Sequence, residues 1–124
     1  MDTTSAQAAM RLLQRRVYHK GDVIFRQDEP GDRAFLVQGG SVEILRDGKL
    51  LGVVVAGGMF GEMALIDREP RMAMARAAEE TACLVIPEEV FRAKLKGADP
   101  FIVGLLRILL TTIRTTSEKL AHQK

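Results

Sequence analysis

Short apolar runs separated by turn residues occupy the middle of this sequence, and they restrict its fold more than any other feature. Between residues 17 and 86 the apolar residues recur mainly with the two-residue period of a β-strand rather than the longer period of a helix. The segments between the runs are rich in Gly, Asp and Pro, and Asp47-Gly48 is typical of a two-residue hairpin turn. Many short strands with such turns predict an antiparallel β-barrel or a double-sheet jelly roll.

Helices are expected on both sides of this strand-rich region, so the predicted fold class is α+β. The chain, 1–124, is interpreted as one domain with an N-terminal helix in 1–16, where Thr4 and Gln7 have the spacing of a capping box. The barrel is expected at 17–86, and the C-terminal helices at 87–121. The predicted strands are 17–19, 23–25, 34–37, 42–45, 50–55, 72–77 and 81–86.

The C-terminal region has the start and stop signals of two helices. Pro87 suits a first helical position, Gly97 ends that helix, and Asp99 can cap a longer one that starts at Pro100. The longer helix has two apolar stripes, so one can pack on the barrel while the other is left to a second copy of the chain. Burial of both stripes within one domain is the alternative. The stripes are Ile102, Leu106, Leu109, Ile113, Thr116 and Leu120, and beside them Phe101, Leu105 and Ile108.

A glycine-rich turn leads into one helical turn and then an arginine. Gly57, Gly58 and Gly61 permit a tight turn, and the amides that begin the following helical turn at Glu62 have no partner within it. Such amides can bind an anion, and Arg71 follows with a guanidinium suited to phosphate oxygens. A surface ion pair between Glu62 and Arg71 would use the same residues. These residue types alone therefore leave open whether the segment forms an anion site or a surface ion pair.

The segment Gly61-Glu62-Met63-Ala64-Leu65, followed by Pro70-Arg71-Met72-Ala73, closely resembles the phosphate-binding cassette of cyclic-nucleotide-binding domains. This family includes catabolite activator proteins, regulatory subunits of protein kinase A and cyclic-nucleotide-gated channels. The resemblance implies a jelly roll with the cassette at 60–73. It extends to further strand and turn segments in the same order, namely 21–25, 31–37 and 40–44.

The resemblance also implies roles for individual residues. Glu62 would accept a hydrogen bond from the ribose 2′-hydroxyl, and Arg71 would bind the cyclic phosphate. We expected Arg71 to be partly solvated without ligand, or paired with a nearby carboxylate, because a buried unpaired guanidinium is unfavourable. The amides of Ala64, Met72 and Ala73 would also contact the phosphate. The full set implied at the ligand is Gly61, Glu62, Met63, Ala64, Arg71, Met72 and Ala73.

The base would be contacted by other residues. Thr116-Ser117 on the long helix resembles the Thr-Ser pair that reaches the adenine in the catabolite activator protein, and Ile44 and Leu51 are candidates for an apolar wall. Met72 and Met74 stand where the family commonly has small or hydroxyl residues. A thioether cannot donate a hydrogen bond to guanine, so the sequence favours cyclic AMP over cyclic GMP.

Composition argues against several other functions. The 18 Lys and Arg nearly balance 16 Asp and Glu, a net charge of +2, which does not argue for a nucleic-acid or membrane partner. The only histidines are His19 and His122, so neither a metal centre nor a catalytic triad is expected, and the chain is predicted not to be an enzyme. The single Cys83 and the absence of a signal sequence fit a cytoplasmic protein.

These features together predict a cyclic-nucleotide sensor, in which ligand binding repositions the C-terminal helix. Its expected partners are the nucleotide and either a second copy of the chain or another protein. Because the sequence stops at Lys124, direct DNA binding by a helix-turn-helix is not expected. The alternatives are a ligand-free relic of the fold that contacts proteins, and the sensor fragment of a larger transcription regulator or channel.

Overall fold

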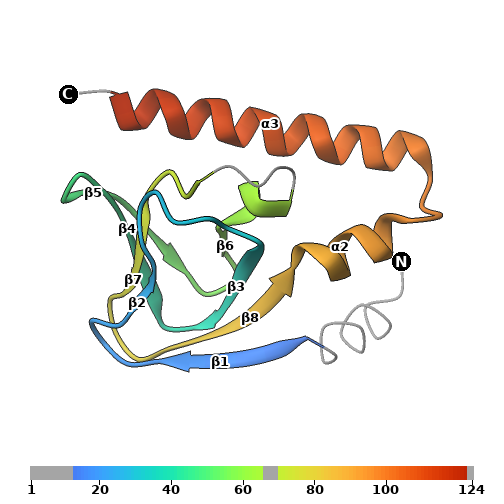
Figure 1. Cartoon of the computed structure of the whole chain (residues 1–124). Coiled ribbons are helices and arrows are strands. Elements are labelled where there is room, and N and C mark those ends of the chain that lie inside the picture. The colour runs from blue at the N-terminus through green and yellow to red at the C-terminus, as the bar shows by residue number, and fades with distance from the viewer. Residues whose placement is uncertain (1–12, 66–69, 123–124) are drawn as a thin grey trace.

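The computed structural model of the protein describes residues 13–65 and 70–122, with side chains described as far as residue 112. A strand-rich body lies beneath one long C-terminal helix (Figure 1). The strands are β1 Gln14–Tyr18, β2 Val23–Phe25, β3 Arg33–Gly39, β4 Ser41–Arg46, β5 Lys49–Val55, β6 Met59–Phe60, β7 Met74–Ala77 and β8 Thr81–Pro87. The helices are the 3₁₀ turn η1 Glu62–Leu65, α2 Glu88–Leu95 and α3 Pro100–His122.

The strands form two antiparallel sheets packed face to face, which confirms the predicted jelly-roll class. One sheet has the order β1-β8-β3-β6, and the other has the order β2-β7-β4-β5. Buried residues from both sheets fill the space between them, and the rings of Phe35 and Phe60 stack with centroids 5.0 Å apart. Cys83 belongs to this core, and burial raises the pKa of its thiol to about 11. At this pKa the thiol stays protonated and unreactive near neutral pH.

Local turn chemistry determined several elements as expected. Asp47 and Gly48 both have positive φ, 52° and 78°, as the hairpin between β4 and β5 requires. Gly97 follows α2 with φ of 87°, and the Asp99 side chain accepts a 2.8 Å hydrogen bond from the Phe101 amide at the start of α3.

Several predicted boundaries were wrong, and the strand expected at 72–77, for example, begins only at Met74. The N-terminal helix was expected to reach residue 16, but Gln14–Tyr18 is strand β1, paired along its length with β8. Its remaining part, 1–12, lies outside the described residues. Pro87 is the N-cap of α2, with ψ of 145°, and not its first helical residue. Met59–Phe60, expected as part of a turn, is the short strand β6, because it pairs with β3 at Phe35 and Leu36.

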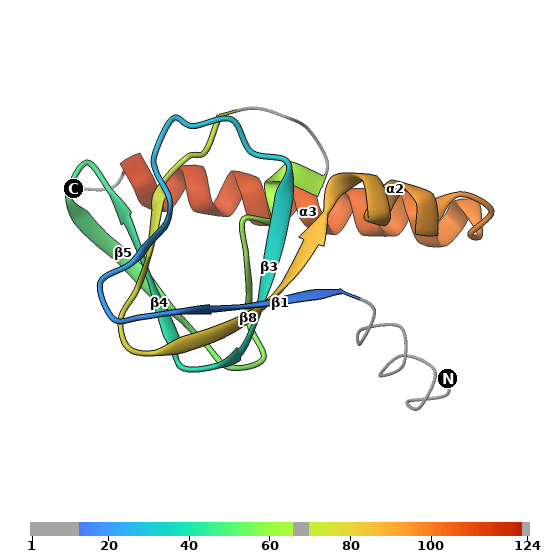
Figure 2. The ribbon, with the colours of Figure 1, turned by 60° about the horizontal axis from the view of Figure 1, so that its bottom comes forward.

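The long helix α3 lies alongside the strand body and passes η1 (Figure 2). Leu110, only 8% exposed, faces the body, and Leu106 is half-buried near it. Leu106 and Leu109, which the sequence assigned to the same stripe, therefore differ in exposure, since Leu109 is 53% exposed. Within the part of α3 whose side chains are described, the large exposed apolar residues are Phe101, Ile102, Leu105, Ile108 and Leu109. Phe101 is 74% exposed and Ile108 is 64% exposed. Side chains of Ile113, Thr116, Ser117 and Leu120 lie outside the described residues.

Candidate functional site

Arg71 lies where three segments of the chain meet. Its own backbone pairs with the loop between β2 and β3, because the Asp28 amide donates to the Arg71 carbonyl at 2.8 Å and the Arg71 amide donates to the Glu29 carbonyl at 2.7 Å. The residue is only 8% exposed. This backbone pairing fixes the direction in which the Arg71 side chain leaves the chain, towards the start of β3 and the start of η1.

The Arg71 guanidinium is held by main-chain carbonyls and an aromatic ring. Its Nη1 donates to the Gly61 carbonyl at 3.1 Å, and its Nη2 donates to the Arg33 carbonyl at 2.8 Å. The guanidinium carbon lies 4.0 Å from the centre of the Phe25 ring, a cation–π contact. The Nε–H is buried and has no hydrogen-bond partner. This donor is the one buried side-chain polar atom without a partner in the part of the chain that the structure describes.

The expectation of a partly solvated or carboxylate-paired Arg71 was wrong. Within the described residues the guanidinium makes no ion pair, and carbonyl oxygens with the Phe25 ring replace the water that it would otherwise bind. Burial lowers the Arg71 pKa, and the nearby Asp32 carboxylate opposes that shift. The orphaned Nε is costly, since an unsatisfied buried donor destabilises by about 1–3 kcal/mol.

Two glycines make room for this arginine. A Cβ on Gly31 would stand 2.5 Å from the Arg71 Nε, and a Cβ on Gly61 would stand 2.8 Å from its Nη1. Gly61 also needs its φ of 71°, which side-chain-bearing residues rarely adopt. The chain therefore approaches the guanidinium from two sides at distances that only glycine allows.

Glu62 starts η1 and is half-buried beside this region. Burial raises the pKa of its carboxyl, while its own amide and the Arg71 charge act in the opposite direction. The Glu62 and Arg71 side chains interact through their charges. The carbonyl of Gly61, the residue before Glu62, accepts a hydrogen bond from the Arg71 guanidinium. They form no ion pair in the described structure, so the surface-pair interpretation does not describe this arrangement.

The three amides expected at a phosphate differ in their availability. The Ala64 amide donates to the Gly61 carbonyl at 3.3 Å within η1, a long bond. The Met72 and Ala73 amides have no hydrogen-bond partner among the described residues. Ala64 and Ala73 are buried, and Met63 and Met72 are half-buried. Free amides and the orphaned Arg71 Nε therefore occur within three consecutive residues.

The sequence did not single out several residues that build this region. Phe25, Gly31 and Arg33 each contact Arg71, and Asp32 lies among them. The Asp32 carboxylate pairs with the Arg33 Nε at 2.8 Å, and this bond, together with the nearby Arg71 charge, lowers the Asp32 pKa. The family resemblance covers 31–37, but it assigned neither Gly31 nor Asp32 to the site.

The structure places the candidate base residues only in part. Ile44 lies on β4 opposite Ala75 of β7 and packs against the core, and Leu51 is half-buried on β5. No described cluster of His, Cys, Asp and Glu could hold a metal ion. Among the helices in the described residues, none is both long and apolar enough to cross a bilayer.

The family model of the cyclic nucleotide-binding domain matches residues 15–97, which span the strands, the cassette and α2. The chain belongs to the cyclic nucleotide-binding domain family, as the cassette resemblance predicted. It is similar to the CRP-like cAMP-activated global transcriptional regulator of Mycobacterium tuberculosis, with 29% identity over 126 residues, covering 98% of this chain and 56% of the relative.

Two further relatives show how widely the domain occurs. The chain is 39% identical over 99 residues to a cyclic nucleotide-gated potassium channel of Mesorhizobium japonicum, covering 79% of this chain and 27% of the channel. The crystal structure of the Thermus thermophilus catabolite activator protein superposes with a TM-score of 0.79 at 29% identity, covering 98% of this chain and 59% of that one. The chain spans about half the length of the regulator and about a quarter of the channel.

Proposed function

We propose that this chain is a regulatory sensor domain that binds a cyclic nucleotide, with cyclic AMP preferred, at the cassette around Arg71. The observation that carries the proposal is the buried Arg71 Nε–H, which has no partner and lies next to the free amides of Met72 and Ala73. Buried donors are normally satisfied, so unsatisfied donors on three consecutive residues favour a site for an anion. The cyclic phosphate is an anion of suitable chemistry, and the family supports it.

The phosphate and the ribose would be bound by different groups. The Arg71 Nε–H and the amides of Met72 and Ala73 would donate to the phosphate oxygens, and charge-assisted bonds of this kind are the stronger ones. The ionised Glu62 carboxylate would accept a hydrogen bond from the ribose 2′-hydroxyl. Gly61 would let the nucleotide approach the main chain, with Met63 and Ala64 completing the turn.

The preference for cyclic AMP rests on Met72 and Met74. Both are half-buried, and neither thioether can donate a hydrogen bond to a guanine edge. Ile44 and Leu51 would supply an apolar wall, with Thr116 and Ser117 as further base contacts from α3. The proposal therefore has two separate parts, binding of the phosphate and ribose and preference for adenine. If the preference for adenine is refuted, the proposed phosphate site still stands.

Ligand binding would be transmitted through η1. Glu62 begins this turn and Leu65 ends it, and Leu65 lines a pocket with residues of α2 and α3. A nucleotide that contacts Glu62 would shift the equilibrium of α3 positions by the difference in its affinity for them. The helix would report the ligand to the rest of the protein.

The exposed apolar face of α3 would bind a second copy of the chain. Ile102, Leu105, Ile108 and Leu109 repeat at helical spacing and are exposed in the single chain. A contiguous apolar patch of this kind marks an interaction surface, and a closed two-fold dimer is the commonest assembly. A different effector protein is the other partner class. We place the sensor in the cytoplasm and assign this domain no catalytic role.

One observation favours the alternative of a ligand-free relic. The Arg71 Nη1 and Nη2 donors already bind the Gly61 and Arg33 carbonyls. The phosphate of a nucleotide must therefore accept its hydrogen bond from Nε or replace one of these carbonyls. A calorimetric titration with cyclic AMP and then cyclic GMP separates the two functions. Saturable binding with tighter cyclic AMP supports the sensor, and no heat with either nucleotide at millimolar concentration supports the relic.

A further inference from the structure

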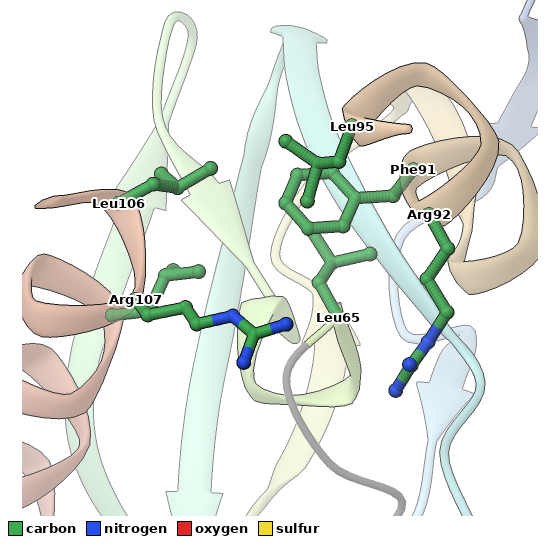
Figure 3. A pocket seen from close by; sticks show the side chains of 7 residues that line it. Leu65, Phe91, Arg92, Leu95, Leu106 and Arg107 are labelled. Atoms are coloured by element: carbon green, nitrogen blue, oxygen red, sulfur yellow. The ribbon is translucent and has the colours of Figure 1, made fainter. Parts of the chain in front are cut away.

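A pocket lies away from Arg71, between η1, α2 and α3. Its volume is about 160 Å³. Five apolar residues and two arginines line it, and Figure 3 shows the two guanidinium groups extending from opposite sides towards the space beside Leu65. The lining residues are Leu65, Phe91, Arg92, Leu95, Leu106, Arg107 and Leu110.

The two arginines differ in their charge balance. The Arg92 Nε donates to the carboxylate of the buried Glu88, so part of its charge is compensated within α2. Arg107 makes no ion pair with a carboxylate among the residues that the structure describes. An apolar wall with one uncompensated guanidinium at its edge complements a molecule that carries both an apolar body and a negative group.

We propose that this pocket binds a small organic anion, with a carboxylate or phosphate head on an apolar body of about one aromatic ring. The size follows from the volume, since apolar cavities of about 150 Å³ accept a single benzene ring. The head binds Arg107, with Arg92 opposite, while the body packs against Phe91, Leu106 and Leu110. The pocket shares Leu65 with the cassette but is lined by neither Glu62 nor Arg71, and it takes a ligand of different shape from a nucleotide.

The pocket is also connected to the cassette. Leu65 forms part of its wall and ends the same 3₁₀ turn that Glu62 begins. A molecule in the pocket therefore contacts η1, α2 and α3 at once. If it changes the affinity for a nucleotide, the nucleotide changes its affinity by the same factor. This coupling rests on the proposed function, whereas binding of the anion does not.

The test is an NMR titration of the whole chain with benzoate, in the absence of nucleotide. We expect saturable shifts of the Leu65, Leu106 and Leu110 methyl signals with a dissociation constant of about 1 mM, as befits nine non-hydrogen atoms. Benzyl alcohol, which has the ring without the charge, should bind at least about fivefold more weakly, because it makes no charge-assisted bond. No saturable shift below 20 mM benzoate would overturn the proposal.

The matched variants are Arg107→Gln and Arg15→Gln. Both remove an exposed arginine, but Arg15 lies on β1 and does not line the pocket. Arg107→Gln should weaken benzoate binding by about fivefold or more, and Arg15→Gln should not change it. Equal affinity for benzoate in the two variants would overturn the anion site. Cyclic AMP binding without benzoate binding would leave only the proposed function, and the reverse result would leave only the pocket.

The coupling has its own measurement. Cyclic AMP is titrated calorimetrically in 10 mM sodium benzoate and in 10 mM sodium chloride, at equal ionic strength. We expect the affinity for cyclic AMP to differ between the two by at least about twofold, because only benzoate carries an apolar body that fills the pocket. Identical affinities would refute the coupling.

Discussion

Gly31 lies against Arg71 so closely that a Cβ on Gly31 would stand 2.5 Å from the Arg71 Nε and 2.7 Å from its guanidinium carbon. The missing side chain at position 31 thus provides the space in which the guanidinium sits, between the Gly61 and Arg33 carbonyls and over the Phe25 ring. The arrangement keeps the arginine inside the domain, with one donor unsatisfied, before any ligand arrives.

The first prediction concerns this space. Gly31→Ala should destabilise the domain by about 1–3 kcal/mol, as overpacking of a dense region does. It should also weaken cyclic AMP binding by about tenfold or more, because the displaced Arg71 loses a charge-assisted bond to the phosphate. Chemical denaturation and calorimetry measure the two effects. Gly39→Ala is the control, since a Cβ there meets no atom within 4 Å, and equal results for both variants would contradict the account.

The second prediction concerns the ring beneath the guanidinium. Phe25→Leu keeps an apolar side chain but removes the π face 4.0 Å from Arg71. The loss should destabilise the ligand-free domain by about 1–2 kcal/mol, from the cation–π contact and the lost packing. Denaturation of Val23→Leu, altered at an exposed position on the same strand, provides the comparison. A Phe25→Leu domain as stable as the Val23→Leu domain would show that the ring does not hold Arg71.

Glu62 gives a prediction about pH. Burial raises its pKa in the folded state, so the folded protein binds the proton more tightly than the unfolded chain does. Because of this difference, ionisation of Glu62 lowers the free energy of unfolding as pH rises from the unfolded-state pKa to the folded-state pKa. Above both pKa values the loss of stability is complete. Glu62→Gln should therefore be more stable than the original protein at pH 7, with the gain disappearing below the ordinary carboxyl pKa.

The same substitution should act oppositely on the ligand. Glu62→Gln removes the carboxylate proposed to accept the ribose hydroxyl, so cyclic AMP binding should weaken by about tenfold or more. Thermal unfolding at several pH values and calorimetry at pH 7 measure the two effects. A variant that is less stable at pH 7, or binds equally well, would contradict the role assigned to Glu62. Glu80→Gln, at an exposed turn, is the control.

The exposed face of α3 provides a prediction about assembly. Ile108→Glu places a charge at the centre of this apolar face, where the side chain is 64% exposed. If a second copy binds there, the variant should sediment as a monomer at concentrations at which the original protein sediments as a dimer, because burying an unpaired charge is unfavourable. Lys94→Glu on α2 should remain a dimer. A monomeric original protein would refute the proposed dimer.

The sequence predicted those elements whose causes are local. Asp47-Gly48, Gly97 and Asp99 each set a turn or a helix end by their own backbone preferences, and each was placed correctly. The cassette segment was also recognised, because its glycines and arginine occur in the order typical of the family. Local chemistry and family pattern thus predicted the barrel, which the structure confirms, and a candidate site around Arg71, which stays a prediction.

Tertiary contacts decided what the sequence missed. Met59–Phe60 is a strand only because β3 lies beside it, and two residues have no period to detect. The burial of Arg71 depends on Gly31, Arg33 and Phe25, which lie far from it in the sequence. The buried face of α3 was likewise not resolved, since both stripes are apolar and only packing shows that Leu110 is inside.

The most direct test of the site is the NMR signal of the Arg71 Nε–H, assigned by its absence in Arg71→Lys. Without ligand this donor is buried and makes no hydrogen bond. On saturation with cyclic AMP we expect its proton signal to move downfield, because it acquires a bond to a phosphate oxygen, while the Arg15 signal stays in place. An Arg71 Nε–H signal that does not move at saturating cyclic AMP would contradict the account.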